Sequence, residues 1–184
     1  MAKFFGKSIV KMDDGDPYLS RRWIGRLRFH VFHRGDQDPD CHDHPWGFWT
    51  FPLVSYVEEV IVPQLADSLH GPFDSVHPIV CEPSKAVRYL RVVPRFRLTF
   101  NKATHTHRVI GPWNGYSTTQ SGYEYPGLPK TKYHNPGVKS GKVVTIVFRQ
   151  RTSRNWGFLK NEGNRWCWQI WREYITGGKN DRCN

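Results

Sequence analysis

Short runs in which apolar and polar side chains alternate constrain the fold of this chain more than any other feature. Residues 22–33 (RWIGRLRFHVFH) place apolar side chains on one parity and mainly basic ones on the other: Trp23, Leu27, Phe29 and Val31 against Arg26, Arg28 and His30. A period of two residues is that of a strand with one buried face. Residues 88–100 (RYLRVVPRFRLTF) alternate in the same way. We therefore expect a half-buried strand in each run.

Two further segments predict strands, and few predict helices. Residues 142–150 (KVVTIVFRQ) have the composition of one strand. Residues 46–62 form a strand region that Pro52 interrupts, because proline cannot donate to a sheet ladder. The segment 164–175 (NRWCWQIWREYI) fits either a short C-terminal helix or an aromatic strand. Many short strands with scarce helical periodicity indicate an all-β barrel or sandwich.

One long segment departs from this pattern. The stretch from about residue 111 to 141 is rich in Gly, Pro, Ser, Thr and Tyr, which predicts a loop insertion that acts as a flap or lid. No repeat or linker divides the chain. We therefore expect a single domain over residues 1–184, with its core at about 17–175.

The composition supports a packed core in spite of a modest apolar content. Hydrophobic residues make up 38% of the chain, but aromatic residues reach 15% with eight Trp, and each buries a large area. No long apolar run predicts a membrane segment or a signal peptide, so we expect a cytoplasmic protein without a membrane partner. The scattered cysteines predict reduced thiols: Cys41, Cys81, Cys167 and Cys183.

The charge of the chain favours anionic partners. Lys and Arg number 27 against 16 acidic residues, which gives a formal net charge of +11. Such a balance suits a nucleic acid, a nucleotide or a small phosphorylated or otherwise anionic molecule. The alternative is that the charge only serves solubility, because the basic residues do not gather in one run. A homodimer is compatible with this sequence, which does not fix an oligomeric state.

Two His-x-His elements carry the strongest signal for chemistry. In CHDHPW, His42 and His44 lie two residues apart, so on a strand both imidazoles point to one side while Asp43 points away. The second element, in NKATHTHRV, supplies His105 and His107. Two imidazoles from one strand and a third from another suit a transition-metal ion. The alternative for each histidine alone is an ordinary surface or hydrogen-bonded residue.

These motifs resemble those of the cupin superfamily, the double-stranded β-helix or jelly-roll barrels. The pattern is similar to that of small bacterial and phage cupin-like proteins in four segments: His42–Trp46, Tyr56–Glu58, His107–Arg108 and Trp156–Phe158. The two histidine motifs also resemble the iron(II) site of cysteine dioxygenase. This chain departs from the usual cupin pattern, because Phe48 and Trp49 stand where a fourth, glutamate ligand is expected.

The resemblance implies a cupin barrel with His42, His44 and His107 as metal ligands, and His105 as the alternative to His107. It implies a three-histidine site with open positions, for which Fe(II) is favoured and Zn, Mn or Ni are alternatives. Three residues near these motifs are candidates for catalysis. Arg108 is expected to bind an anionic substrate group, and its alternative is a surface strand arginine. Glu58 is expected to act as acid or base, with a solvated strand end as its alternative, and Tyr56 to line the barrel mouth.

Further residues are assigned around this site. Trp46 and Trp49 are expected beside Tyr56 at the barrel mouth, and the alternative for all three is ordinary aromatic core. Asp36 or Asp40 is expected to orient a ligand imidazole.

Three functions follow from this reading. The first is an iron(II) oxygenase, of the cysteine dioxygenase type, that acts on a small polar or anionic molecule. The second is a redox-silent metal enzyme, such as an isomerase, epimerase or lyase that acts on a sugar or nucleotide. The third is a basic module that binds nucleic acid and holds the metal only for structure.

Overall fold

The computed structural model describes residues 4–11, 14–36, 38–63, 80–81, 86–117, 135–161 and 166–176, and all structural statements below concern these residues. They form fourteen strands and one short helix. The elements are β1 (Phe5–Lys11), β2 (Pro17–Ile24), β3 (Leu27–Phe32), β4 (Cys41–His42), β5 (Phe48–Pro52), β6 (Tyr56–Pro63), β7 (Val80–Cys81), β8 (Ala86–Val93), β9 (Thr99–Asn101), β10 (Thr106–Ser117), β11 (Asn135–Val138), β12 (Val143–Arg149), β13 (Gly157–Asn161), β14 (Trp166–Ile170) and α1 (Trp171–Ile175).

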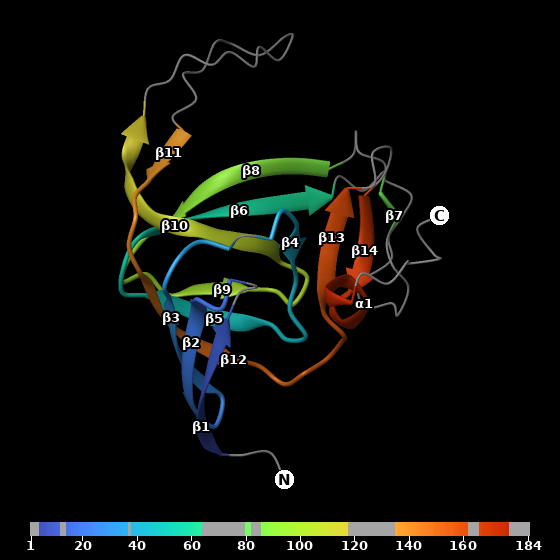
Figure 1. The fold of residues 1–184 in the computed structure, drawn as a ribbon, viewed down its shortest axis with the longest axis horizontal. Helices are drawn as coiled ribbons and strands as arrows, with labels where there is room; N and C mark the ends of the chain where they lie inside the picture. The colour runs from blue at the N-terminus through green and yellow to red at the C-terminus, as the bar shows by residue number, and fades with distance from the viewer. Residues whose placement is uncertain are drawn as a thin grey trace.

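Eight of the strands form a jelly roll. Strands β3 and β12, β4 and β10, β5 and β9, and β6 and β8 pair antiparallel as four nested pairs, as in one long hairpin. This hairpin is rolled up, because β12 also pairs β5 and β10 also pairs β6. The result is two antiparallel sheets with the orders β3-β12-β5-β9 and β4-β10-β6-β8 (Figure 1). The predicted all-β jelly-roll class is therefore confirmed.

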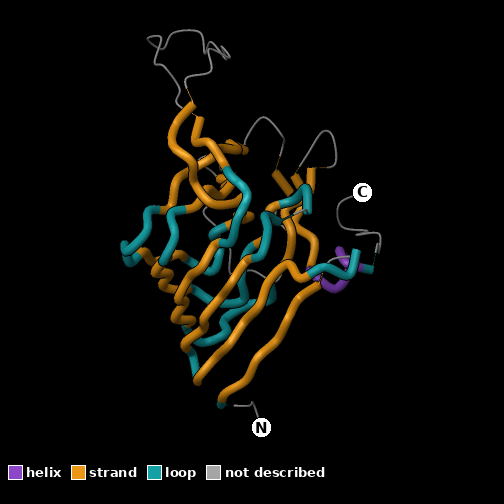
Figure 2. The backbone as a smooth tube through the Cα atoms, turned by 60° about the vertical axis from the view of Figure 1, so that its left-hand side comes forward, coloured by secondary structure: helices purple, strands orange, loops and turns teal. Residues whose placement is uncertain are grey.

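Additional strands widen both sheets. Strands β1 and β2 extend the first sheet beyond β3, and this six-stranded sheet has the order β1-β2-β3-β12-β5-β9. Strands β13, β14 and β7 extend the second sheet beyond β4. Helix α1 follows β14 at one side of the molecule (Figure 2). No described helix has the length and apolar character needed to cross a membrane.

Two alternating runs each become two strands rather than one. The run 22–33 turns back at Gly25, where φ is +55°, so that its halves form the β2–β3 hairpin. The run 88–100 breaks after Pro94 and supplies β8 to one sheet and β9 to the other. The sequence alternation continues through the first turn although the face changes, because Trp23 is aligned with Arg28 and not with Leu27, so the pattern alone does not reveal the turn. The strand regions at 46–62 and 142–150 form as predicted, with Pro52 closing β5.

The two segments of uncertain type contain regular structure. The predicted loop insertion holds strand at both ends, because β10 runs on to Ser117 and pairs with β11, an extension that projects from the sheets in Figure 1. Residues 118–134, the centre of the expected flap, lie outside the described residues. The C-terminal segment contains both predicted alternatives, first strand β14 and then helix α1.

The outer face of the six-stranded sheet carries a row of exposed apolar side chains. Each residue of the row is the direct cross-strand partner of the next, from β1 to β9: Phe5, Ile24, Leu27, Phe148, Trp49 and Phe100. All six side chains are at least 40% exposed. Trp49, which was expected at the barrel mouth, therefore lies on the outside of the sheet, where it packs against Phe100.

The inner face of the same sheet carries basic and hydroxyl side chains beside apolar ones. This face is marked by buried residues of β5 and β12: Thr50, Val143, Thr145 and Val147. Arg21 and His30 are aligned with Thr145, and Arg28 is aligned with Val147, so these basic side chains share the inward parity. The apolar parity of residues 27–31, which periodicity alone would bury, faces outward instead.

Two apolar clusters fill the described core. One joins Tyr56, Val93, Val109 and Val143 between the sheets, and the other joins Cys41, Ile61, Leu159 and Trp166. Cys41 is a free thiol, as expected, but Cys167 is disulfide-bonded. The prediction of four reduced thiols is thus wrong for Cys167, whose partner lies outside the described side chains.

The inward position of His30 predicts a pH-dependent stability. Burial, together with the charges of Arg21 and Arg28, lowers the pKa of His30 to about 3. The unfolded chain therefore binds a proton at this residue below pH 6.5 that the folded chain rejects until about pH 3. The free energy of unfolding of the wild type is therefore expected to fall as the pH drops through this window. We expect it to fall less steeply in His30→Asn, by up to about 1.4 kcal/mol per pH unit. Urea unfolding of both proteins at pH 7, 6 and 5 measures this difference. The same change of the free energy of unfolding with pH in both proteins would contradict it.

Candidate metal centre

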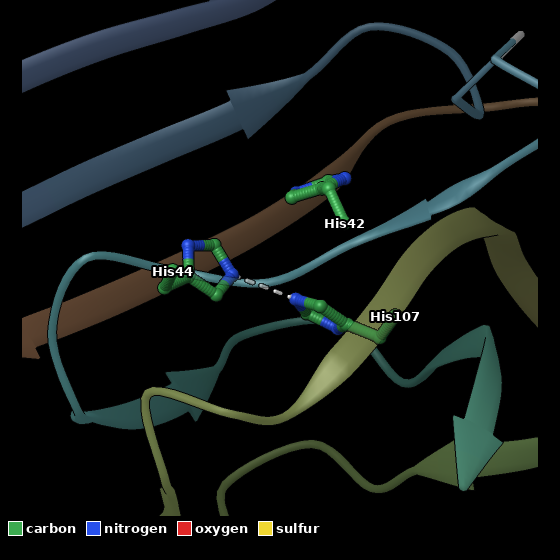
Figure 3. A group of neighbouring side chains, drawn as sticks. All are labelled: His42, His44 and His107. Carbon is green, nitrogen blue, oxygen red and sulfur yellow. Dashed lines mark hydrogen bonds between the residues drawn. The ribbon is translucent and has the colours of Figure 1, made fainter. Parts of the chain in front are cut away.

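The jelly-roll register brings the two His-x-His elements together. His42 ends β4, and its direct partner across the β4–β10 pair is His107. His44 follows in the turn after β4, where its backbone N–H donates to the Ala103 carbonyl at 3.0 Å. Residues far apart in the chain thus share one end of the sheet. The predicted convergence of His42, His44 and His107 is what the structure shows (Figure 3).

The three imidazoles have the spacing of a metal-ligand set. Their ligand nitrogens all lie within 4.8 Å of one another, and the Nε2 atoms of His44 and His107 are 2.9 Å apart. Bonds of about 2.0–2.1 Å to a divalent ion place nitrogens roughly 3–4 Å apart. A single ion between the rings therefore needs only small side-chain adjustments.

The protonation state also suits a metal. Burial, together with the neighbouring His107 and His105, lowers the pKa of His42 to about 3. Burial and the same neighbours hold the pKa of His44 well below its usual value. These two imidazoles are neutral at pH 7, which is the form that coordinates metal ions.

Glu58 lies behind His107 rather than beside the three imidazoles. Its carboxylate is 1% exposed and accepts a hydrogen bond from His107 Nδ1 at 2.7 Å. Burial raises the pKa of Glu58, but His107 and His105 outweigh it and hold the pKa well below its usual range. A proton fixed on Nδ1 leaves the Nε2 lone pair of His107 free for a metal. Glu58, predicted as an acid or base, is placed to orient this ligand.

His105 belongs to a second group around the same carboxylate. Glu58, His105 and His107 also offer ligand atoms within 4.8 Å of one another. However, the Arg91 guanidinium contacts the Glu58 carboxylate and lies 3.1 Å from His105 Nε2. Arg91 already supplies the positive charge at this place, which disfavours a metal ion there. The set His42, His44 and His107 is therefore the stronger candidate.

The acidic residues before and between the histidines have separate roles. Asp36 Oδ2 lies 3.6 Å from His42 Nδ1, whereas Asp40 accepts a hydrogen bond from the Tyr174 hydroxyl at 3.1 Å. Asp36 is thus the expected residue that approaches a ligand. Asp43 points away, as predicted, and accepts hydrogen bonds from the Gly157 backbone N–H and the Trp168 indole, at 2.8 and 2.9 Å.

Aromatic rings form an apolar wall around the three imidazoles. Phe48 and Trp46 have ring centroids 4.7 and 5.1 Å from that of His44. Trp156 and Phe158 lie 6.0 and 5.6 Å from His42. Of these four, only Trp46 was predicted at the site, although the WGF motif at 156–158 was a signal for the other side of the wall.

Two predicted catalytic residues make no contact with the three imidazoles in the described part of the chain. Tyr56 is 4% exposed within the core cluster, and burial and Glu58 raise its pKa well above the usual value. Arg108 follows His107 on β10 and so points to the opposite face, where it contacts Glu59 and donates to the Asp38 carbonyl at 2.7 Å. The anion-binding role predicted for Arg108 has no support from this position.

The ligand set predicts which histidine variants lose metal. We expect His42→Ala, His44→Ala and His107→Ala each to lower the affinity for Zn²⁺ or Co²⁺ by at least 100-fold, because each removes one of three ligands. Titration calorimetry on metal-free protein measures this. His33→Ala is the matched control, since His33 instead lies 2.8 Å from the Ser20 hydroxyl. Equal losses in all four variants would contradict the ligand set.

The contact behind His107 predicts a smaller effect. We expect Glu58→Gln to lower metal affinity by about 10- to 100-fold, because the amide orients the imidazole less strongly than a carboxylate does. Glu59→Gln is the control, since Glu59 is the chain neighbour of Glu58 but pairs with Arg108 and Arg88 on the other face. An affinity unchanged in Glu58→Gln would contradict the orienting role.

Comparisons with known proteins give only distant structural likeness. No protein-family model matches the chain, and no curated protein matches it in sequence. Two solved structures are similar: Fe(II)-HppE with the alternative substrate (S)-1-HPP, and hydroxypropylphosphonic acid epoxidase from S. wedmorenis. Each is 10% identical over 78% of this chain, with TM-scores of 0.39 and 0.38. The match spans 56% and 55% of those chains. The candidate centre is therefore assigned from its own geometry.

Proposed function

We propose that this chain is a metal-dependent enzyme of the cupin type, with Fe(II) held by His42, His44 and His107, that oxygenates a small anionic molecule. The observation that carries the proposal is the convergence of three imidazole ligands without a carboxylate among them. Fe(II) held by these three neutral imidazoles would keep its full charge and would supply redox chemistry between dioxygen and an anionic substrate.

The residues around the three imidazoles support this role. Glu58 holds a proton on His107 Nδ1 and keeps that ring in one orientation. The wall of Trp46, Phe48, Trp156 and Phe158 excludes water from one side of the centre and lowers the local dielectric. A dry and positively charged centre attracts an anionic reactant more strongly than a solvated one.

Metal identity is the first test. Protein prepared without a histidine tag and under anaerobic conditions is expected to contain close to one iron per chain, with the iron lost in His42→Ala and His107→Ala and kept in His33→Ala. Oxygen consumption with a panel of small thiols and carboxylates is then expected only from the iron-loaded form.

Each alternative result has a distinct meaning. Zinc or manganese without oxygen consumption would replace the oxygenase with the redox-silent isomerase, epimerase or lyase class. No bound metal, in variants that remain folded, would overturn the proposed function altogether.

A further inference from the structure

We propose that Arg21, Arg28 and Arg149 form a subsite for the oxyanion of a carboxylate or phosphate group, on the inner face of the six-stranded sheet beside the candidate metal centre. This inference rests on the proposed function, since it names the substrate group that the centre would work on. It also replaces Arg108, which faces away, as the expected anion-binding side chain.

Strand register places these arginines on the inner face. Arg21 of β2 pairs with His30 of β3, which pairs in turn with Thr145 of β12, a residue 3% exposed. Arg28 pairs with Val147, which is 8% exposed and has the same parity. Side chains of directly paired residues lie on the same side of a sheet, so both arginines point inward.

Arg149 connects this group to the metal centre. It follows Val147 by two residues on β12, so it has the same parity, and its direct partner on β5 is Phe48. The Phe48 ring packs 4.7 Å from His44 and 6.1 Å from His107, centroid to centroid. The cross-strand neighbour of Arg149 is thus part of the wall around the candidate ligands.

These arginines lack the carboxylate partners that others have. Arg34, Arg91, Arg108 and Arg154 each form an ion pair with Asp or Glu. In the described part of the chain no carboxylate pairs with Arg21, Arg28 or Arg149, and the buried Nε atoms of Arg21 and Arg149 have no hydrogen-bond partner. Arg28 donates to the carbonyls of Gly25 and Leu27, at 2.7 and 3.1 Å, and lies 5.5 Å from the centre of the Trp23 ring, and none of these groups carries a negative charge.

The charges also act on one another. Burial lowers the pKa of Arg28, and the neighbouring charges of Arg149 and Arg21 lower it further. Three mutually repelling cations on a partly buried face are costly without a compensating anion. A bound oxyanion would supply that compensation, and a guanidinium matches the two oxygens of a carboxylate or phosphate in a bidentate manner.

The position of the subsite would allow it to orient a substrate at the metal. A substrate whose anionic group binds the arginines would have its remaining part directed along Phe48 toward His44. The binding free energy of the remote oxyanion would thereby orient the reactive group at the metal. The inferred substrate class is a small molecule with a terminal carboxylate or phosphate separated from its reactive group.

Anion titration tests the subsite without requiring turnover. Inorganic phosphate and oxalate are titrated separately into the wild type, Arg28→Gln, Arg149→Gln and Arg22→Gln, with calorimetry and the melting temperature as readouts. Arg22 is the matched control, because it is next to Arg21 but lies exposed on the outer face opposite Phe29. We expect saturable binding that falls at least tenfold in Arg28→Gln and Arg149→Gln and is unchanged in Arg22→Gln.

Other outcomes would overturn the inference. Equal weakening in Arg22→Gln would show that only net charge matters, and an absence of saturable binding of either anion to the wild type would remove the subsite. Preference for phosphate or for oxalate tells which oxyanion the subsite takes. Arg28→Lys keeps the charge but not the planar fork, so it is expected to fold and still bind more weakly than the wild type.

The same proteins separate this inference from the proposed function. His42→Ala is expected to lose metal and still bind phosphate, whereas Arg28→Gln is expected to keep metal and lose phosphate. Phosphate binding in a protein that never takes up metal would leave the subsite standing and overturn the proposed function alone.

Discussion

The pairing of β4 with β10 is the constraint on which the candidate site depends. β4 has only two residues, and it is held between β10 and β13 with His42 directly opposite His107. The Asp43 carboxylate, 2% exposed, reinforces this place by accepting hydrogen bonds from Gly157 and Trp168 and by pairing with Arg154 at 2.7 Å. Removal of one partner from a buried pair costs about 3–5 kcal/mol. The ligand geometry therefore rests on a carboxylate that points away from the ligands.

Charge inside the molecule is distributed in an asymmetric way. Three of the four buried carboxylates of the described residues, Asp43, Glu58 and Glu59, each have an arginine partner, and the fourth, Asp40, accepts a hydrogen bond from Tyr174. The inward arginines of the six-stranded sheet have no such carboxylate among the described residues. Part of the strongly positive charge, from which the sequence predicts an anionic partner, thus lies on the inner face of the six-stranded sheet. Basic side chains on the inner face and a row of apolar side chains on the outer face are the reverse of what stability alone would select.

Local patterns and the motif resemblance were enough to predict the strand content and the convergence of three candidate ligand histidines. Period-two alternation follows from backbone pleating, which needs no knowledge of neighbouring strands. His42 and His44 were predictable as a pair because their spacing is set within one strand, and the motif around His107 favoured it over His105. The turn at Gly25 and the break after Pro94 were missed, because alternation continues on both sides of a turn. The disulfide of Cys167 had no local signal, since pairing between distant cysteines depends on the fold.

The sequence by itself determined that this protein is built of β-strands and that three of its histidines have the spacing and context of metal ligands. Only the tertiary structure decided which side of each strand faces inward, because parity is local but the choice of face depends on the partner sheet. The same pairing placed Glu58 behind His107, turned Arg108 away, and brought Arg21, Arg28 and Arg149 to one inner face. These relations join residues far apart in the chain, so only long-range strand register fixes them.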